Sequence, residues 1–566
     1  MRDDRRGATS AGLMPAAVVG IVAVAVPPRG LAMALVGAQS PLLDRVIAGV
    51  WCFKGLLALH ALLLVVLPRW SPGGPGAGRD APRPARGPST TERERVWDRA
   101  LGALVIAALG ARLIHLGEGL WFDEIWTLVQ YVELPWGELV VTFDTQNQHF
   151  LYSLAAKAAT ALPLSEAAAL RLPAALFGAG SIAALYVLGV LVTSRREAFL
   201  AAAVLAFSSH HVWFSQNARG YTGVLFFSLL ATWLFLRMLR AETRGWKLPL
   251  LYAAVAALAV YTHLTAALTV VAHALVFGVR ELAAVRRGRG VPAGPRRAAV
   301  AGLLLATTFS LQLYALVLPQ LPQTLGGGEG AAASVAWTSP LWLLSEMVAG
   351  LARGVPGGAI SLLAVGLIGV VGLVGYARRD LTLVGLMILP ALLTAIAMIA
   401  TRHNLWPRFF FASAGFAVLI GVRGVFEATR LLRLPAPRTV ATAALALATA
   451  ASALTIPRAW GPKQDHEGAA EYVDRLLRPG DAVVVLDMTE VPFEEYLGRS
   501  YRTVRTREEL LDVERAHART WLLYSFPTRL SAEYPEIWSR LQTEYREVTS
   551  FPGTVEGGAV VLTRRG

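Results

Sequence analysis

The chain has 566 residues, of which 55% are hydrophobic and only 16% are charged. Its mean hydropathy of +0.49 lies well above that of an ordinary soluble protein and indicates a polytopic membrane protein. A formal net charge of +14 would suit nucleic acid, but the arginines stand in short runs between apolar segments, as they do at a cytoplasmic membrane face, so we discount nucleic-acid binding. The single cysteine, Cys52, excludes an internal disulfide framework and a cysteine-based metal cluster.

Membrane spans are predicted along most of the chain up to residue 457. A helix needs about 20 mostly apolar residues to cross the hydrocarbon core of a bilayer. Runs of this kind occur near residues 12–37, 46–67, 99–117, 170–193, 197–214, 219–240, 248–262, 264–280, 298–318, 357–377, 382–401, 407–424 and 438–457. The first run contains Pro27, Pro28 and Arg29, so a re-entrant or interfacial piece is the alternative there. The pattern predicts an α-helical polytopic membrane protein with about 13 transmembrane helices.

Four regions are predicted from these runs and from the composition between them. Two N-terminal spans occupy residues 1–67, and residues 68–98, rich in Pro, Gly and Arg, form a flexible cytoplasmic linker. The membrane bundle extends over 99–457, and a C-terminal region follows over 458–566. In this last region an amphipathic helix, a Pro-Gly-Asp turn and strand-like runs such as 520–526 predict a small α/β domain.

Arginine-rich loops predict the orientation of the bundle. The loop at 280–297 carries six arginines, which favours the cytoplasmic side by the positive-inside rule. Counting spans outward from this loop puts the long loop at 118–169 and the tail from 458 onward on the outer face. We therefore expect a multi-pass protein of the cell (inner) membrane, with its catalytic side and its C-terminus outside the cytoplasm.

Two adjacent carboxylates, Asp123 and Glu124, stand between Trp121 and Trp126 in the outer loop. A carboxylate against an apolar wall is suited to accept a proton, so Asp123 is the first candidate for a general base. The alternative is a helix N-terminus capped by two acids, with the tryptophans as interfacial anchors. For Glu124 the two interpretations stand equal.

Cationic and aromatic residues on the same outer side offer the opposite charge. Taken singly, each is explained by snorkelling or by helix packing. Taken together, they predict an anion site, which would suit a lipid-linked phosphate whose tail stays in the bilayer. These residues are Arg219, Tyr221, His263, Arg402, His403 and Arg408.

The outer loop also carries Asp144 and His149, which we include among the candidates for substrate binding. Together with Asp123 and Glu124, these residues leave a divalent cation such as magnesium, calcium or manganese as a possible cofactor, because hard oxygen ligands suit these metals. No tight ligand spacing supports this site, so it stays a minor alternative.

Several sequence motifs resemble those of a known family. They are the Asp-Glu pair after the first bundle helix, "QHFLYSLAAK", "SEAAALRLPAALFGAGSIAALYVLG", "SQNARGYT" and "YTHLT". Over residues 99–457 the chain resembles the membrane-embedded glycosyltransferases of the C-type fold, in the branch of the protein O-mannosyltransferases and the aminoarabinose transferases of lipid A. The resemblance implies transfer of a sugar from a polyprenyl phosphate to an acceptor outside the cytoplasm, with inversion at the anomeric carbon.

The resemblance also implies roles for individual residues. Asp123 would be the general base toward the acceptor hydroxyl, and Glu124 would support it or hold the acceptor. His149 would meet the donor phosphate, although Phe150 stands where relatives carry a proline. In addition, Arg219 and Tyr221 match an Ala-Arg-x-Tyr pattern near the site, and Arg408 matches a looser one, whereas Arg171 can equally lock the loop to the bundle.

Three rival functions remain open at this point. A transporter or lipid flippase predicts charges near mid-membrane and broken helices in paired halves. Here the notable charges gather at one face and no repeat is apparent in the sequence. A polymerase or ligase of surface polysaccharide shares the donor chemistry, and a non-catalytic scaffold would merely present the tail. The sugar, the length of the polyprenol and the acceptor, which is a protein, a lipid or a glycan, do not follow from the sequence.

Overall fold

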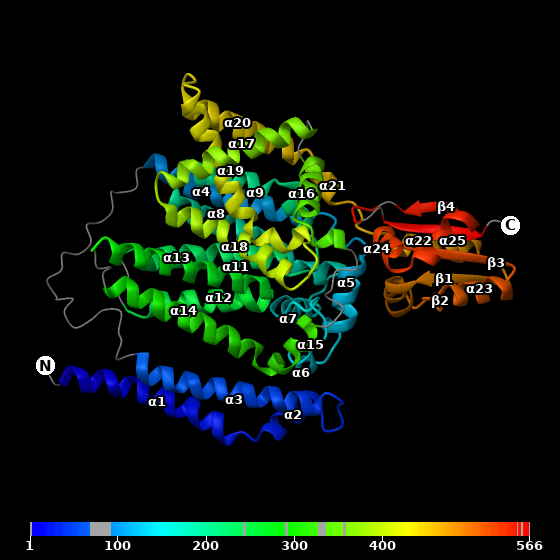
Figure 1. Ribbon diagram of the computed structural model, residues 1–566, viewed down its shortest axis with the longest axis horizontal. Helices are drawn as coiled ribbons and strands as arrows, with labels where there is room; N and C mark the ends of the chain where they lie inside the picture. Colours follow the sequence, from blue (N-terminus) through cyan, green and yellow to red (C-terminus); the bar gives the residue numbers. More distant parts are fainter. Residues whose placement is uncertain are drawn as a thin grey trace.

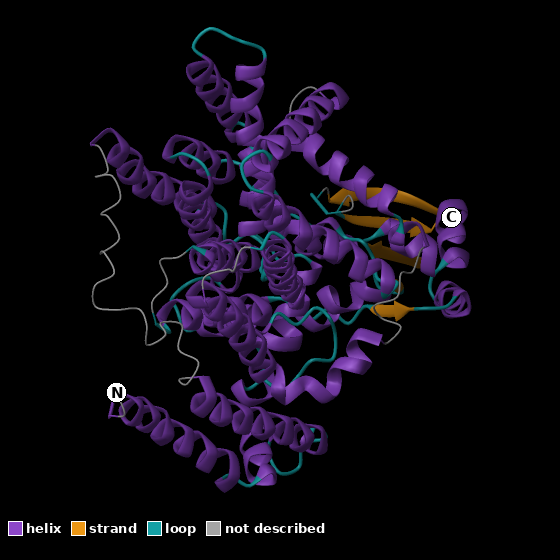
Figure 2. Cartoon of the chain, turned by 60° about the vertical axis from the view of Figure 1, so that its left-hand side comes forward, coloured by secondary structure: helices purple, strands orange, loops and turns teal. Residues whose placement is uncertain are grey.

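The computed structural model describes residues 3–67, 92–240, 245–288, 293–326, 335–354, 358–551, 553–555 and 558–564. Long helices lie side by side in a bundle, and a small sheet-containing domain is attached at one end of it (Figure 1). Within the described residues strands occur only in this C-terminal domain (Figure 2). The predicted class, a helical membrane bundle with a small C-terminal α/β domain, is confirmed.

The N-terminal region contains three helices, α1 (Asp3–Ala25), α2 (Pro28–Val36) and α3 (Leu43–Val66). Between α1 and α2 the chain bends by 78°. The prolines at 27 and 28 explain the bend, because proline lacks an N–H group and cannot continue the hydrogen-bond ladder of a helix. The Lys54 Nζ donates a hydrogen bond to the Val26 carbonyl at 2.7 Å, which satisfies a carbonyl freed at the bend. The first apolar run is therefore not one continuous helix but a bent pair, which is a broken span or a re-entrant loop.

The main bundle begins at α4, which starts at Glu92, so the helix includes the end of the predicted linker. Residues 68–91 of that linker lie outside the described residues. The helices of the bundle are α4 (Glu92–Leu113), α8 (Glu166–Val192), α9 (Arg195–Ala206), α10 (Ser209–Ser215), α11 (Tyr221–Leu239), α12 (Lys247–Thr262), α13 (Ala267–Arg286), α14 (Ala293–Tyr314), α16 (Pro340–Gly354), α17 (Gly358–Ala377), α18 (Leu381–Ala400), α19 (Ala414–Leu431) and α20 (Pro437–Ala453).

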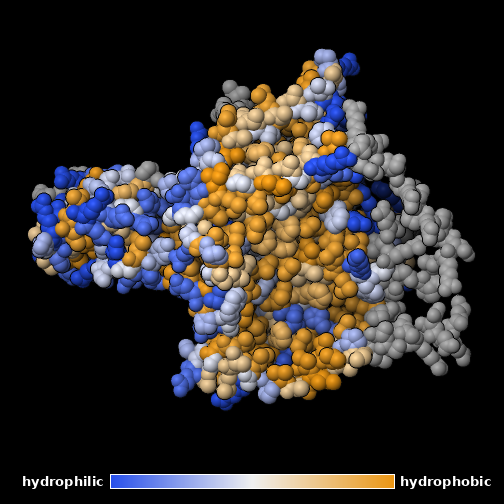
Figure 3. Space-filling model, turned by 180° about the vertical axis from the view of Figure 1, so that it is seen from behind, coloured by the Kyte–Doolittle hydropathy of each residue, from blue (hydrophilic) through white to orange (hydrophobic). Residues whose placement is uncertain are grey.

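Fewer helices qualify as membrane spans than the thirteen predicted. Within the described residues, six helices are long and apolar enough to cross a membrane, or up to nine if each of three bent pairs is counted as one span. The surface agrees with a membrane environment, since an apolar face covers the bundle while the C-terminal domain is hydrophilic (Figure 3). On α13, for example, Val279 is 68% exposed, as expected of a side chain that faces lipid.

One bend within the bundle shapes the outer end. The run at 197–214 was predicted as one span, but it divides into α9 and α10, which meet at 63°. The Ser208 side chain accepts a hydrogen bond from the His211 N–H and so caps α10, while the buried Arg112 donates to the Ala206 carbonyl at the end of α9. The bend brings the turn between α10 and α11, which contains Arg219, beneath the outer loop.

The outer loop contains three short α-helices, α5 (Phe122–Thr127), α6 (Trp136–Leu139) and α7 (Phe150–Ala159), and a π-helical turn, η2 (Leu128–Val132), directly after α5. The segment "YSLAAKAATAL" predicts a helix that lies on the surface; α7 covers most of it, but Tyr152, Ser153, Ala156 and Ala159 are buried. At Gly137 of α6 the backbone lies so close to α2 that a Cβ atom would meet the Leu35 carbonyl oxygen at 2.0 Å. The N-terminal helices therefore pack directly against the outer loop, and only glycine fits at this contact.

The C-terminal domain contains one five-stranded sheet in the order β2-β1-β3-β5-β4. Strand β1 pairs in parallel with β2 and β3, whereas β5 pairs antiparallel with β3 and β4. The elements are α22 (His466–Leu476), β1 (Asp481–Leu486), β2 (Arg502–Val504), α23 (Arg507–Ala516), β3 (Arg519–Tyr524), α24 (Pro527–Glu533), α25 (Pro535–Glu544), β4 (Tyr545–Phe551) and β5 (Ala559–Arg564). Two further short helices are α15 (Leu321–Gly326), which follows α14, and α21 (Ile456–Ala459), which lies between the bundle and α22 of the C-terminal domain.

Candidate active site

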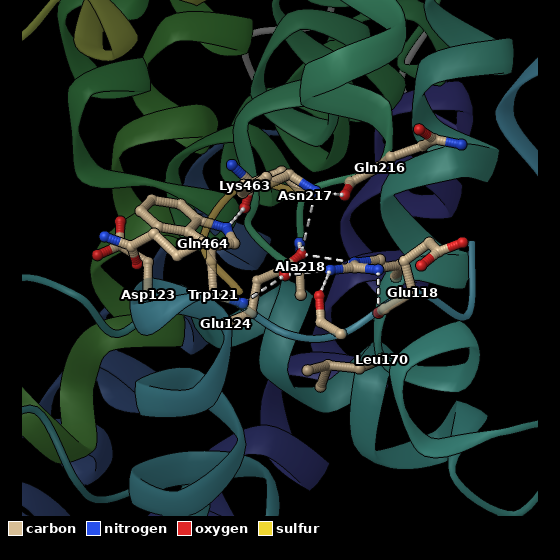
Figure 4. Close-up of polar contacts among 12 residues, drawn as sticks. Glu118, Trp121, Asp123, Glu124, Leu170, Gln216, Asn217, Ala218, Lys463 and Gln464 are labelled. Atoms are coloured by element: carbon tan, nitrogen blue, oxygen red, sulfur yellow. Dashed lines mark hydrogen bonds and ion pairs between the residues drawn. The ribbon is translucent and has the colours of Figure 1, made fainter. Parts of the chain in front are cut away.

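The two neighbouring acids lie in the first turn of α5 and face different surroundings. Successive side chains of an α-helix project about 100° apart, so Asp123 and Glu124 cannot share one partner. In Figure 4 the Glu124 carboxylate lies inside a cluster of polar contacts, whereas Asp123 lies to one side of that cluster. Each acid therefore has its own environment.

The Asp123 carboxylate faces a cation that comes from a distant part of the chain. Its Oδ2 accepts a hydrogen bond from the Arg408 Nη1 at 3.1 Å. Asp123 is 6% exposed, but the Arg408 side chain is 32% exposed and lies over the rings of Trp406 and Phe409. The surroundings of Asp123 are thus not the purely apolar wall expected from the tryptophans, because a guanidinium lies against the carboxylate.

Glu124, in contrast, is completely enclosed by partners from the protein. Arg171 donates to Oε1 at 2.8 Å and to Oε2 at 2.5 Å, and the Ala218 N–H donates to Oε1 at 2.8 Å (Figure 4). The Lys463 Nζ lies 3.9 Å from Oε1. Burial raises the pKa of Glu124, but the charges of Arg171 and Lys463 outweigh it and lower the pKa below its usual value. Glu124 is therefore a buried anion that holds the loop in place.

Arg171 completes this lock. Besides Glu124, its guanidinium donates hydrogen bonds to the carbonyls of Leu116, Glu118 and Gly119 at 3.1, 2.7 and 2.9 Å. All five donors of a guanidinium lie in a fixed fork, so one arginine can fix several carbonyl groups at once. The geometry agrees with the expectation that Arg171 locks the loop to the bundle.

Arg219 is buried to 2% exposure and has no carboxylate partner among the described residues. Its Nη1 donates to the Thr127 Oγ1 at 2.9 Å, and its Nη2 donates to the Asn147 Oδ1 at 2.8 Å. The Nε has no hydrogen-bond partner in the part of the chain that the structure describes. A buried charge without a counter-ion is costly, so this guanidinium is prepared to bind an anion.

Two neutral histidines lie beside this guanidinium. The His149 and His263 rings are 4.6 Å apart, and the Arg219 Nη2 is 3.4 Å from the His149 Nε2. Burial, together with the charge of Arg219, lowers the pKa of His149 well below its usual value and that of His263 to about 3. The His149 Nδ1 accepts a hydrogen bond from the Gly220 N–H at 2.9 Å, which agrees with the neutral form. The ring of Tyr221 packs edge-on against His149.

A pocket of about 190 Å³, including space open to solvent, lies between Arg408 and His263; Asp123, His149 and Arg219 are not among its lining residues. It is lined by Tyr221, Val224, His263, Thr265, Arg408, Phe409, Phe411 and Ala412. The pocket therefore borders both Arg408, which binds Asp123, and His263, which lies next to His149. Aromatic and aliphatic side chains form the remaining walls, as in many small-molecule sites.

The remaining candidates do not join this pocket. Asp144 is exposed and accepts hydrogen bonds from the Tyr131 hydroxyl and the Thr145 N–H, at 2.9 and 2.8 Å. Across the described ranges, no three His, Cys, Asp or Glu side chains are grouped so that they could hold a metal ion. Asp123, Glu124, Asp144 and His149, the four residues considered for a divalent cation, thus have different partners and are not grouped around one point.

Sequence reasoning missed several residues that build the site. Thr127 and Asn147 hold the Arg219 guanidinium, and Lys463 and Gln464 approach α5 from the start of the C-terminal domain. The only signal for the last two was their position in "GPKQDHEG", directly after the final apolar run. A polar pair at that place is common at a membrane surface, so the sequence gave no reason to connect it with Glu124.

Residues 148–287 match the family model described as dolichyl-phosphate-mannose-protein mannosyltransferase. The chain is a glycosyltransferase. The matched segment includes His149, Arg219 and His263 but neither Asp123 nor Arg408. The expected resemblance to the protein O-mannosyltransferases is confirmed. A comparison with curated proteins finds no match.

Proteins from two organisms are among the solved structures with which the chain shares similarity. ArnT from Cupriavidus metallidurans in the apo state has 12% identity and a TM-score of 0.49, with 83% of this chain and 98% of that chain covered. The same enzyme bound to undecaprenyl phosphate gives 14% identity, a TM-score of 0.44 and coverage of 82% and 98%. The oligosaccharyltransferase AglB from Archaeoglobus fulgidus, in complex with an inhibitory peptide and a dolichol-phosphate, has 13% identity and a TM-score of 0.43, with 81% of this chain and 73% of that chain covered.

Proposed function

We propose that this glycosyltransferase moves a sugar from a polyprenyl-phosphate-linked donor to a hydroxyl group of an acceptor outside the cytoplasm. One observation carries the proposal: a buried arginine without a carboxylate partner, Arg219, lies at the same end of the bundle as the Asp123–Arg408 pair. The match of residues 148–287 to the mannosyltransferase family supports the donor class.

The chemistry that these groups can perform is a single displacement. The acceptor oxygen forms a bond to the anomeric carbon while its proton passes to the Asp123 carboxylate. The bond between that carbon and the phosphate oxygen breaks, and its electron pair leaves with the polyprenyl phosphate. Negative charge develops on the leaving phosphate, where the guanidinium groups of Arg219 and Arg408 stabilise it. A single displacement inverts the configuration at the anomeric carbon.

The pairing of Arg408 with Asp123 provides a link between donor binding and proton acceptance. An arginine presents five N–H donors, so Arg408 can bind a phosphate oxygen as well as a carboxylate. When a phosphate takes over part of this guanidinium, Asp123 loses some of its cationic partner and becomes a better base. The partial exposure of the Arg408 side chain leaves room for such a shift.

His149 and His263 serve this site as neutral groups. Because their pKa values are lowered, both stay uncharged at neutral pH and can donate or accept hydrogen bonds without adding charge. In this role they would contact phosphate or sugar oxygens beside Arg219. The lipid tail would remain in the bilayer, in keeping with the apolar surface of the bundle (Figure 3).

The transporter or flippase considered from the sequence has one observation in its favour, the three bent helix pairs. Broken helices often surround transport sites near the middle of the membrane. In this chain, however, α5, which carries Asp123, lies at one end of the bundle beside the C-terminal domain (Figure 1), and Arg219 binds Thr127 of the same helix. Group transfer at that end therefore explains the arrangement better than passage through the bundle.

A release assay tests the proposal. The full-length protein in lipid nanodiscs is incubated with a set of polyprenyl-phosphate sugars and with peptide, lipid and glycan acceptors, and free polyprenyl phosphate is measured. We expect release with at least one donor and a loss of about a thousandfold in Asp123→Asn, which retains the size of the side chain. Full activity of Asp123→Asn, with normal membrane insertion, would refute Asp123 as the base.

A further inference from the structure

The segment at residues 460–465 connects the bundle to the C-terminal domain and lies beside α5. On the side of the domain, the Thr554 N–H donates to the Pro462 carbonyl at 3.1 Å, and the Val555 N–H donates to the Lys463 carbonyl at 3.0 Å. The segment is therefore fixed to the domain through its backbone. Its side chains remain available to contact the bundle.

Lys463 directs its side chain into the bundle next to Glu124. Its Nζ donates to the Gln216 carbonyl at 2.6 Å, lies 3.9 Å from the Glu124 Oε1 and stands over the ring of Trp213. The side chain is only 5% exposed. The C-terminal domain thus supplies a second cation to the buried carboxylate, in addition to Arg171 from α8.

Gln464 contacts the beginning of α5 itself. Its Oε1 accepts a hydrogen bond from the Phe122 N–H at 3.1 Å, across 342 residues of sequence. The first N–H groups of a helix have no partner within the helix, so an oxygen at this point acts as a cap. Because Phe122 directly precedes Asp123, this cap fixes the backbone that carries the proposed base.

Apolar contacts extend the same interface. The ring of Phe526 meets that of Phe122 edge-on, with the centroids 5.5 Å apart. Val491 of the domain belongs to one buried cluster with Leu120 and Ile125 of the outer loop. The domain therefore packs against α5 with both polar and apolar groups.

We propose that Lys463 and Gln464 are positioning residues, through which the C-terminal domain holds α5 and sets the place of Asp123 relative to Arg408. This inference rests on the proposed function. It assigns the domain a part in catalysis without any contact to the substrate. A domain that was merely attached would not need to place a buried lysine beside Glu124.

The charge of Lys463 gives this role a signature in the pH dependence. Burial lowers the pKa of Lys463 to about 7, the Glu124 carboxylate raises it in part, and the Arg171 guanidinium lowers it. Glu124, Arg171 and the uncharged Trp213 are the groups that face the amine from α5, α8 and α10. As the pH rises through this value, the amine loses its charge and its attraction to Glu124, and α5 is held less firmly.

Hydrogen exchange tests the hold on α5 without any substrate. In full-length protein in nanodiscs, Gln464→Ala should speed exchange in a peptide over residues 119–127 by about tenfold, because the Phe122 amide loses its partner. Gln542→Ala, at an exposed position of α25, is the matched control and should change nothing. Exchange in β5 reports whether the domain remains folded. Unchanged exchange over 119–127 in Gln464→Ala would overturn the proposed hold.

Kinetics with a donor that the release assay identifies test the catalytic consequence. Lys463→Met should lower kcat by about tenfold, with KM for the donor changed by less than about twofold, since Arg219 and Arg408 remain in place. The decline of wild-type kcat as the pH rises through about 7 should be absent in this variant. Lys247→Met, an exposed lysine at the start of α12, is the control.

The outcomes separate the inference from the proposed function. If the wild-type protein releases polyprenyl phosphate while Lys463→Met matches it in kcat and pH profile, the positioning role is overturned and the function stands. If Lys463→Met lowers kcat with little change in KM and Gln464→Ala speeds exchange over residues 119–127, the positioning role and the proposed function both stand. If no donor supports release by the wild-type protein, the function fails, and the exchange experiment still reports how α5 is held.

Discussion

Asp123 and Glu124 are adjacent in sequence, yet the two sides of α5 differ in almost every respect. On the side of Glu124, Arg171, Lys463 and the Ala218 N–H surround a carboxylate with no exposure to solvent. On the side of Asp123, Arg408 approaches from a partly open pocket. A carboxylate whose oxygens are all bound by fixed donors cannot take a proton without loss of the loop structure. The pair thus divides its work between anchoring and chemistry.

The largest effect is expected on the anchoring side. Glu124→Gln keeps the shape of the side chain but leaves the buried Arg171 and Lys463 without their anion, which should cost about 3–5 kcal/mol of stability. Thermal unfolding of the purified protein measures this loss. Glu133→Gln, an exposed acid of the same loop, should unfold at the wild-type temperature. Equal stability of Glu124→Gln and wild type would remove the distinction between the two acids.

On the chemical side, Arg219→Met should reduce kcat/KM by about 10²–10³-fold, because the leaving phosphate loses a buried cation. Removal of an uncompensated charge should leave the folded protein at least as stable as the wild type. Arg402, which the sequence grouped with Arg219, is exposed and does not line the pocket, so Arg402→Met provides the comparison and should retain its activity within about twofold. The assay of polyprenyl phosphate release measures both variants, and equal losses in the two would contradict a specific phosphate site.

The neutral histidines sharpen the comparison through pH. The pKa of His263 is lowered to about 3, so between this value and about 6.5 the unfolded state binds a proton that the folded state does not. Stability is therefore full above about pH 6.5 and falls on acidification, by about 2 kcal/mol for this residue at about pH 5. Thermal unfolding at about pH 5 and at about pH 7 should show this loss of stability, and the difference should be smaller in His263→Gln. A melting temperature that is the same at both values would indicate a charged histidine in the folded protein.

The smallest effect is expected for Arg408→Lys. Lysine keeps the charge but lacks the planar fork that can contact Asp123 and a phosphate together, so turnover should fall by about tenfold. We expect the pH optimum of kcat to shift as well, because the ammonium group holds Asp123 differently. Steady-state kinetics over a pH series measure both quantities. A variant as active as the wild type would show that Arg408 acts only through its charge.

Much of the fold could be predicted from the sequence, because apolar runs and arginine-rich loops follow directly from the physics of the bilayer. The run at 197–214 shows the limit of this reasoning. Apolar composition gave no sign of the bend after Ala206, which depends on the Ser208 cap and on the buried Arg112 of another helix. Bends of this kind account for the difference between six and nine candidate spans in the described residues, whereas the apolar helices Lys247–Thr262 and Leu363–Ala377 are too short to count as spans.

The functional site, too, could be predicted only in part. Charged residues at an outer membrane surface were recognisable one by one, and the structure brings Asp123, Arg408, His149, His263 and Arg219 to one end of the bundle. The partners of Glu124 were not recognisable, because Lys463 and Gln464 lie more than three hundred residues away and carry no local pattern. Nor could the sequence show that Asp144 turns toward Tyr131 and away from the pocket.

The most direct test of the central claim is a structure of the full-length protein with undecaprenyl phosphate in nanodiscs. The phosphate should lie within hydrogen-bond distance of both Arg219 and Arg408, on the Asp123 side of α5, with the lipid chain directed into the bilayer. Arg219 would then have gained the anion that it lacks among the described residues. A phosphate bound elsewhere, with Arg219 still in contact only with Thr127, Asn147 and His149, would contradict the proposed site.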